Sequence, residues 1–361
     1  MTDDYERLSS EVHGRKVGSK KVRAVAMLIV VFGVIAIVFL YLFSLTQGAY
    51  PISFAEAFEQ MKIIIETMGN PEDMSGSIIF TIRMPRSIAV LLVGAGLAVA
   101  GAVMQALIHN PLVDPYVTGV SSGASFGVVL MTLGGVISVG SVATMWLIPV
   151  GAIIGAVGAF MLTMTVAEAA GGKAMSYVLG GTIMAAGMSA GTTLIMYFNA
   201  DKIQHITSWM FGSFATVQWD DVMIMFIPII LIIAFMVLQA RKLNVMLLGE
   251  TQAQYLGMNA RTYKRNLLIL VAILTAFCVA YCGVIGFLGL VIPHLCRMVV
   301  GGDHRVLLPT SIVVGSLVLL VADIICKSNP SGELPIGAII SVVGVPFFIY
   351  LMVKEGKKYV M

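Results

Sequence analysis

Phosphate and metal chemistry are the first possibilities that the residues of this chain raise. The glycine-rich segment Gly171-Gly172-Lys173-Ala174 resembles part of a phosphate-binding loop, but the upstream glycine and the magnesium-binding hydroxyl residue are absent. The sequence contains no HExxH zinc motif and no GxSxG nucleophile motif. Its four cysteines lie in or beside apolar stretches without CxxC spacing, as small buried hydrophobic residues do. We therefore expect no enzyme activity, no metal site and no cofactor.

Ionisable residues within apolar stretches are the second possible source of chemistry. A carrier driven by protons or sodium ions normally keeps such residues near the middle of the bilayer. Asp323 is the main acidic candidate, but it lies near the end of its apolar stretch with Lys327 four residues later. That spacing favours a helical ion pair, so we interpret Asp323 as structural. If the protein transports a solute, we expect the energy to come from another subunit.

The composition indicates which type of secondary structure positions these residues. Of 361 residues, 58% are hydrophobic and 11% are charged, whereas about a quarter of a soluble domain is charged. The apolar stretches are uninterrupted, unlike the alternating strands of membrane barrels. At about 20 residues per span, they predict an all-α polytopic membrane protein of about ten transmembrane helices. A net charge of +3 gives no reason to expect nucleic-acid binding.

Ten apolar stretches are long enough, or nearly long enough, to cross a membrane. The eighth is short, contains Pro293 and follows a glycine-rich segment, so we expect a broken or tilted element that faces protein, where freed backbone groups can be satisfied. The predicted spans are residues 24–45, 87–108, 116–136, 144–167, 176–198, 221–240, 266–283, 286–300, 307–326 and 335–353.

The distribution of basic residues predicts the orientation. With a cytoplasmic N-terminus, 17 Lys and Arg residues fall on the inner side and five on the outer side, which places both chain ends in the cytoplasm. The predicted organisation is a basic cytoplasmic tail (residues 1–23), a ten-helix transmembrane domain (residues 24–353) in a cell membrane, and a cytoplasmic C-terminal tail (residues 354–361). Ten spans also permit two inverted five-span repeats, although no internal sequence match supports this division.

Three segments outside the spans have recognisable patterns. Ser53 and Glu56 have the spacing of a capping box before an amphipathic helix on the outer face. In residues 199–220, Trp209 and Trp219 are interpreted as interface anchors in preference to a role in substrate passage. The longest inner loop, residues 241–265, is too polar to span and has basic flanks, so we expect short helices that dock into a partner.

A known family resembles this sequence along most of its length. Residues 83–101 read RMPRSIAVLLVGAGLAVAG, and residues 104–106 (MQA) and 110–115 (NPLVDP) follow. These segments closely resemble the FecCD-like permeases of ABC importers for iron-siderophores, haem and vitamin B12, of the type II importer class. The same order continues in residues 119–124 (GVSSGA), 209–213 (WMFGS), 249–257 (GETQAQYLG), 286–294 (GFLGLVIPH), 303–305 (DHR), 322–323 (AD), 333–337 (ELPIG) and 344–347 (GVPF).

The resemblance implies a non-enzymatic translocation subunit. Permeases of this family pair as homodimers, move substrate along the dimer interface, and work with two cytoplasmic ATPase subunits and an extracytoplasmic binding protein. An iron(III)-siderophore or haem is then the expected cargo. Cobalamin or a molybdate-type oxyanion remains an alternative on the same scaffold, and an ion-coupled secondary transporter remains one from a different class. Pairing with a paralogous permease also remains open.

The resemblance also assigns roles to particular residues. Arg83 and Arg86 match arginines that receive acidic residues of the binding protein, with snorkelling at the end of the span as the alternative. Lys327 matches a third docking position that is often Arg. The remaining assignments are coupling to the ATPase for Gly249, Glu250, Ala253, Leu256 and Gly257, and an inner gate formed by Asn110, Pro111, Leu112, Lys173, Ala174, Met175 and Ser176. The stiff turn of Pro111 and Pro115 suits an ordinary tight connection equally well.

Overall fold

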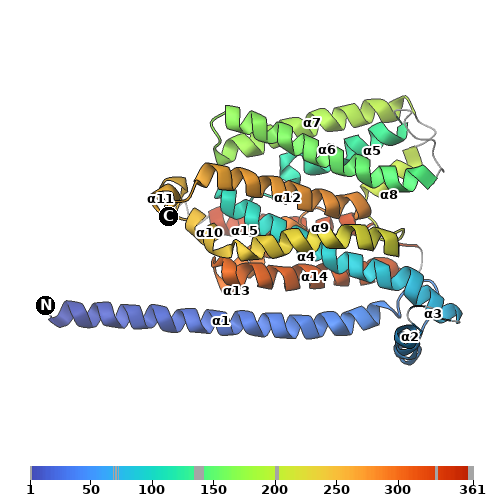
Figure 1. Cartoon of the computed structure of the whole chain (residues 1–361), viewed down its shortest axis with the longest axis horizontal. Coiled ribbons are helices and arrows are strands. Elements are labelled where there is room, and N and C mark those ends of the chain that lie inside the picture. The colour runs from blue at the N-terminus through green and yellow to red at the C-terminus, as the bar shows by residue number, and fades with distance from the viewer. Residues whose placement is uncertain are drawn as a thin grey trace.

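The computed structural model is a bundle of helices that run roughly along one axis (Figure 1). It describes residues 2–67, 69, 71, 73–133, 142–199, 203–329 and 332–356, and this part of the chain contains no strand. Some predicted segments lie partly outside these ranges: residues 134–136 of the third predicted span, residues 200–202 of the segment before the sixth span, and residues 1 and 357–361 of the tails.

The ten predicted spans correspond in order to ten apolar helices. Seven contain segments long and apolar enough to cross a membrane, and three apolar helices are shorter. The ten are α1 (Thr2–Ser44), α4 (Met84–Ile108), α5 (Val120–Leu133), α6 (Val142–Ala169), α7 (Ala174–Tyr197), α9 (Trp219–Leu238), α12 (Ala260–Cys282), α13 (Leu288–Val300), α14 (His304–Lys327) and α15 (Ile336–Gly356). The all-α, ten-helix prediction is confirmed.

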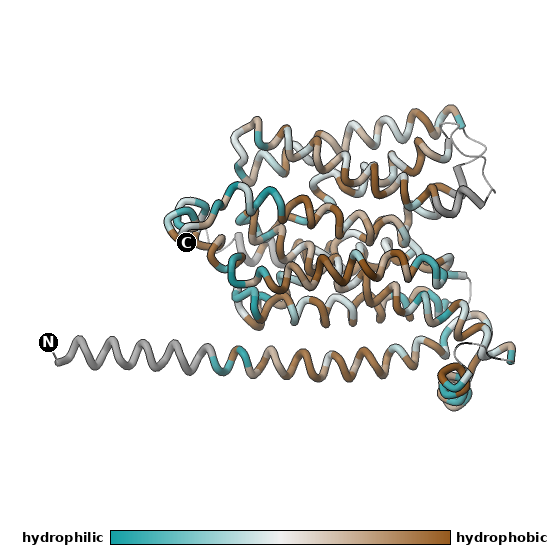
Figure 2. Tube along the Cα trace, viewed as in Figure 1, coloured by the Kyte–Doolittle hydropathy of each residue, from teal (hydrophilic) through white to brown (hydrophobic). Residues whose placement is uncertain are grey.

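Short elements occupy the two ends of the bundle. One end carries α10 (Ala240–Met246) and α11 (Glu250–Tyr255), and α1 starts and α15 ends there (Figure 1). The opposite end carries α2 (Phe54–Glu66), α3 (Met74–Ile78) and α8 (Ile203–Met210). Apolar residues line the middle of the bundle, and hydrophilic residues gather toward its ends (Figure 2). We call these the inner and outer ends, following the predicted orientation.

Two predictions about the outer and N-terminal segments differ in detail from the structure. Ser53 does cap the predicted amphipathic helix, since its hydroxyl accepts from the Glu56 amide at 3.2 Å. The Glu56 carboxylate, however, accepts from the Ser75 hydroxyl. The predicted basic tail also continues the first span as one helix, α1, because no proline or glycine pair interrupts it.

Close contacts between small residues bring α4 into the centre of the bundle. A Cβ atom on Gly94 would lie 2.6 Å from the carbonyl oxygen of Gly315 on α14. On the same helix, a Cβ atom on Gly101 would lie 1.8 Å from the carbonyl oxygen of Gly289 on α13. Helices in a membrane gain no hydrophobic driving force from one another, so close backbone packing of small residues is a main source of their association. Glycine at these positions therefore holds α13 and α14 against α4.

Gly101→Val is expected to prevent α13 from packing on α4. The added side chain would meet backbone atoms, which cannot move aside as a flexible side chain can. We expect loss of the monodisperse protein in size-exclusion chromatography in detergent. Gly158→Val is the matched control, because a Cβ atom on this α6 glycine meets nothing within 4 Å. Normal elution of Gly101→Val would contradict the tight α4–α13 contact.

The eighth span is broken, as the sequence predicts. At 13 residues, α13 is about 20 Å long and too short to cross a bilayer. Residues 284–286 precede it outside any helix, and Ile285 is fully buried. The Ile285 amide donates to the Tyr116 hydroxyl at 3.4 Å, and the Cys282 carbonyl accepts from the Ser213 amide at 2.9 Å. Protein groups thus replace the missing helical partners at membrane depth.

Candidate functional site

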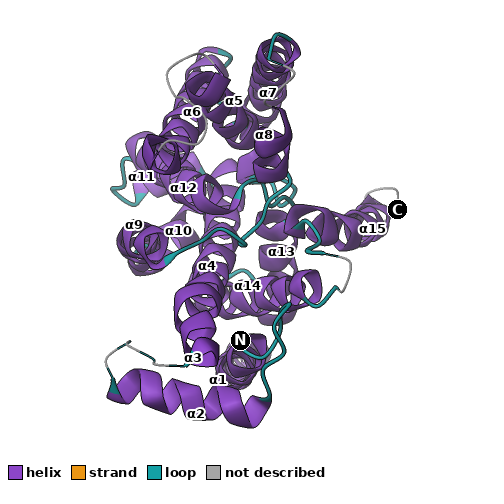
Figure 3. Cartoon of the chain, turned by 90° about the vertical axis from the view of Figure 1, so that its right-hand side faces the viewer, coloured by secondary structure: helices purple, strands orange, loops and turns teal. Residues whose placement is uncertain are grey.

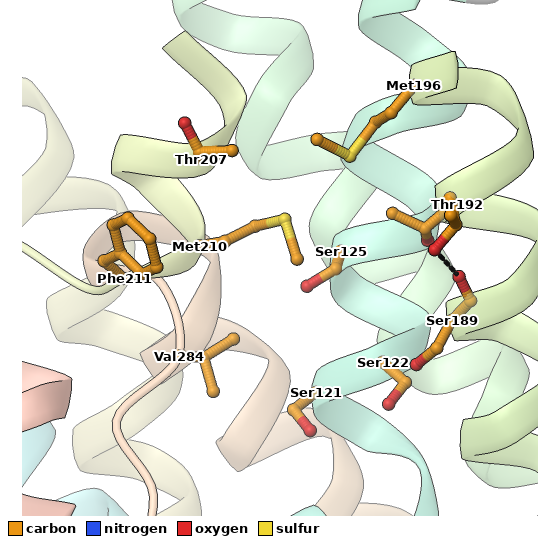
Figure 4. Close-up of a pocket in the computed structure, with 11 residues that line it drawn as sticks. Ser121, Ser122, Ser125, Ser189, Thr192, Met196, Thr207, Met210, Phe211 and Val284 are labelled. Atoms are coloured by element: carbon orange, nitrogen blue, oxygen red, sulfur yellow. Dashed lines mark hydrogen bonds between the residues drawn. The ribbon is translucent and has the colours of Figure 1, made fainter. Parts of the chain in front are cut away.

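A cavity of about 380 Å³ lies between α5, α7 and α8 (Figure 4). Hydroxyl side chains from all three helices line one part of it, and methionine, phenylalanine and valine side chains line the rest. No lining residue in the described part of the chain is charged. The lining consists of Ser121, Ser122, Ser125, Ser189, Thr192, Thr193, Met196, Thr207, Met210, Phe211 and Val284.

Helical spacing places these hydroxyl groups together. On α7, Ser189, Thr192, Thr193 and Met196 recur at intervals of three, one and three residues, which form one stripe of a helix. Thr192 and Thr193 each donate their hydroxyl proton to a carbonyl four residues earlier at 2.9 Å. Their oxygen lone pairs remain free to accept. The wall can therefore hold a large ligand through neutral polar and apolar contacts.

The segment around α8 closes one side of the cavity and contains the tryptophans that the sequence interpreted as interface anchors. The indole of Trp219 donates to the Phe80 carbonyl at 2.7 Å, and Trp209 packs against the core. Met210 and Phe211, next to Trp209, line the cavity. Both tryptophans are half-buried and Phe211 is exposed, so the aromatic segment packs only partly against the protein, and the anchor role stays a prediction.

The three basic residues assigned to docking are buried at the outer end. Arg83, Arg86 and Lys327 are 5, 6 and 7% exposed. Arg83 donates to the carbonyl oxygens of Leu45 and Tyr50, and Lys327 donates to the Ser44 carbonyl at 2.8 Å. These contacts fasten the end of α1 to α4 and α14.

Arg86 lies at the centre of an internal ion-pair network. Its guanidinium is 2.8 Å from an Asp323 oxygen and 2.6 Å from a Glu333 oxygen. The predicted pair of Asp323 with Lys327 is confirmed at 3.6 Å. Of the two carboxylates, only Glu333 is accessible, with 42% of its side chain exposed. In this arrangement Arg86 is paired within the chain, and its role in docking stays a prediction.

At the inner end, the predicted coupling residues form a short helix with a buried anchor. Gly249 and Gly257 flank α11 with φ values of 101° and 81°, which favour glycine. Ala253 is fully buried, whereas Leu256 is exposed. Glu250 pairs at 2.8 Å with Lys264, whose side chain is 11% exposed. Lys264 also reaches the Gly172 carbonyl at 3.4 Å and lies over the Tyr177 ring.

The residues that immediately precede the two predicted gate segments contact the inner loop of residues 241–265. Lys264 joins α11 to the loop that precedes Lys173, Ala174, Met175 and Ser176. The other segment begins after His109, whose ring nitrogen is 2.6 Å from the Met246 carbonyl at the end of α10. There, the Asn110 side chain accepts from the Leu112 amide at 2.9 Å and stiffens the turn around Pro111. Sequence reasoning missed Lys264 as a link, because nothing in its local pattern identifies its partners.

Comparison with known proteins identifies the fold that carries these features. The model of the FecCD transport family matches residues 24–354. The chain belongs to this family. FecCD proteins are permease subunits of ABC importers, in which ATP is hydrolysed by separate subunits. The family implies a permease dimer with ATPase partners.

Named relatives agree with this assignment. The hemin transport system permease of Yersinia pestis is 35% identical over 91% of this chain and 96% of its own length. The vitamin B12 import permease of Salmonella paratyphi A is 37% identical over 77% of this chain and 84% of its own length. A solved inward-facing structure of a metal-chelate type ABC transporter superposes with a TM-score of 0.75 at 31% identity, covering 90% of this chain and 99% of that one.

The inner loop of this FecCD permease also contains a buried carboxyl group. Asp114 accepts from the Tyr116 amide at 2.8 Å and caps the turn Pro115–Thr118. Burial raises the pKa of Asp114 from 3.8 to about 6, and hydrogen bonds from Tyr116 and Leu290 limit the rise. The ionised form is therefore less favourable in the folded protein than in the unfolded chain.

Asp114→Asn is expected to flatten the pH dependence of stability. Because the folded pKa is raised, the folded state binds the proton more tightly, and this stability is lost as pH rises from about 4 through about 6. A shift of about two pKa units corresponds to about 3 kcal/mol. Thermal unfolding in detergent between pH 4.5 and 7.5 should show the loss in the wild type and little change in the variant. Equal slopes would contradict the assignment.

Proposed function

We propose that this permease imports a metal chelate, an iron(III)-siderophore or haem, into the cytoplasm. The uncharged cavity of serine, threonine, methionine and phenylalanine side chains is the observation that carries the proposal. Such a wall suits a bulky chelate that presents both apolar surface and oxygen or nitrogen donors. An oxyanion such as molybdate requires cationic or amide-rich contacts, and no basic residue occurs in the described lining.

The substrate path is proposed to lie between two copies of the chain. Exposed apolar residues on α7 and α15 support this arrangement, because they give a second copy an apolar face beside the cavity. Gly337, at the start of α15, packs against the Val284 and Phe211 carbonyls at the cavity wall, where a Cβ atom would lie within 2.8 Å of both. The exposed apolar side chains on the two helices include Leu179, Ile183, Leu194, Val342 and Val343.

Energy and delivery are proposed to come from separate proteins. Two cytoplasmic ATPase subunits would contact α11 through Glu250 and Leu256, and an extracytoplasmic binding protein would deliver the chelate at the outer end. Docking on Arg86 would require an acidic residue of that protein to displace Glu333, the one accessible carboxylate of its network. Both chain ends would then lie in the cytoplasm, and the protein would reside in a cell membrane.

The proposal is tested by blocking the cavity. Ser189→Trp places a large ring on the exposed α7 wall of the cavity without disturbing a buried contact. In proteoliposomes with the ATPase and the binding protein, we expect uptake of the labelled chelate to fall at least about tenfold, because the ring occupies the path. Radiolabelled ferric siderophore, haem and cobalamin should be compared.

Thr165→Trp is the matched control, since Thr165 is an exposed hydroxyl residue on α6 that does not line the cavity. It should transport at the wild-type rate. Wild-type uptake by Ser189→Trp would contradict the assigned path, and uptake without the ATPase would favour an ion-coupled carrier.

A further inference from the structure

A second concave region of the molecule, separate from the cavity, lies at the inner end between α9, α10 and α12. Its upper part has a volume of about 560 Å³ and borders Leu256 and Gly257 of the coupling segment. Its lower part, about 420 Å³, extends between α9 and α12. Lys242, Tyr263 and Asn266 line both parts, so the two form one continuous groove. We call it the inner groove.

The inner groove changes from polar to apolar with depth. Lys242 and Asn259 lie at its upper part, near the inner end. Phe235 lies one helical turn below Gln239 on α9, and Leu270 lies seven residues beyond Tyr263 on α12, about 10 Å deeper. Charged, amide and hydrocarbon side chains therefore follow one another with depth, as the headgroup and the acyl chains do in one leaflet of a bilayer.

Two polar groups in the inner groove lack partners. The Gln239 side-chain oxygen Oε1 is buried without a hydrogen bond. Lys242 forms no ion pair or hydrogen bond with the residues that the structure describes. The Gln239 oxygen is closed to a ligand in this arrangement, whereas Lys242 is exposed and accessible to one. Lys242 supplies a cation for a phosphate close by.

The position of the inner groove in the bundle indicates which class of ligand can occupy it. Figure 3 shows α9 and α10 on the side of the bundle opposite α15, so the inner groove faces away from the proposed second copy. A water-soluble ATPase could cover the upper part beside Leu256, but it could not reach Phe235 and Leu270 within the hydrocarbon layer. A lipid of the inner leaflet can occupy both parts.

We propose that the inner groove binds an anionic phospholipid, such as phosphatidylglycerol. Its phosphate pairs with Lys242, and an acyl chain follows Phe235 and Leu270. The headgroup then lies against Leu256 and Gly257 of the segment that precedes α12. This site is independent of the transported cargo.

Native mass spectrometry of the purified full-length permease in detergent tests the site, with phosphatidylglycerol and phosphatidylcholine as probes. We expect the wild type to bind phosphatidylglycerol more tightly. Lys242→Gln should weaken phosphatidylglycerol binding about fivefold, the contribution of one basic residue near an anionic surface. Arg241→Gln is the matched control, because it removes the same charge from an exposed neighbour that does not line the inner groove. It should bind as the wild type does.

Leu270→Trp provides a test that leaves the charge unchanged. The ring fills the apolar part of the inner groove, so phosphatidylglycerol retention should fall while Lys242 remains in place. Equal binding of the two lipids by the wild type would mean ordinary boundary lipid and would overturn the proposal. So would equal losses for Lys242→Gln and Arg241→Gln. If the ATPase covered this groove in lipid-free detergent and the permease preferred neither lipid, the groove would be a protein-docking surface instead.

Discussion

Asp323→Ala is expected to lower the free energy of unfolding by about 3–5 kcal/mol, the usual cost of removing one partner from a buried ion pair. Asp323 is fully buried, and it balances Arg86 at 2.8 Å and Lys327 at 3.6 Å. Without it, two buried cations face each other with only the exposed carboxylate of Glu333 for compensation. Unfolding in detergent with a denaturant titration would measure the loss.

Two further variants make the Asp323 prediction specific. Glu333→Gln should cost less than about 1 kcal/mol, because its side chain is 42% exposed and solvent screens the pair. Replacing Arg86, Asp323 and Lys327 together by methionine and leucine should recover much of the lost stability, since no charge is then left unpaired. A single Asp323→Ala variant as stable as the wild type would show that the network is not a structural element of the outer end.

Lys264→Met is expected to uncouple ATP hydrolysis from transport. The side chain keeps its length but loses the contact with Glu250 and the hydrogen bond to Gly172, which together join α11 to the gate segment before α7. Movement of α11 would then reach the gate segment less effectively. We expect the uptake per ATP hydrolysed to fall about tenfold while ATPase activity persists, which corresponds to about 1.4 kcal/mol of coupling.

Two further variants distinguish a loss of coupling from a loss of folding. One exchanges the charges of the pair, and the other is a surface control. Glu250→Lys combined with Lys264→Glu should restore part of the transport ratio, because the two side chains would still attract each other. Arg261→Gln should have little effect, since Arg261 is exposed and lies 3.9 Å from Glu168. If Lys264→Met transported with an unchanged ratio of uptake to hydrolysis, the link through Gly172 would have no role in coupling.

The spans could be predicted from local sequence patterns because the physical requirements for a transmembrane helix act within a short stretch of residues. A helix in hydrocarbon must satisfy its own backbone and present apolar side chains for about 20 residues, and both requirements appear in a short window. The seventh and eighth spans were placed within a few residues of α12 and α13, apart from the first turns of α12. The break between them was also predicted, because Gly283 and Gly286 mark it. The confirmed resemblance likewise depended on ordered short motifs.

The site could be predicted only in part from the sequence. Glycines flanking Glu250 and the pair of Asp323 with Lys327 are visible as short spacings. The cavity wall was missed, although Ser189 and Thr192 follow a helical interval, because hydroxyl residues also occur on faces that contact lipid or other helices. The burial of Arg83 and Arg86 was missed because the outer ends of α1 and α14 cover them.

The sequence by itself determined the membrane class, the number and order of the spans, and the family. These follow from composition and from contacts within a few residues. Only the tertiary structure decided that Arg86 pairs with Asp323, 237 positions away, and that Lys264 joins α11 to a loop 92 positions earlier. The physical reason is that a buried charge takes whichever opposite group the helix packing brings within about 3 Å, and the close approach of glycine-rich helices sets that packing.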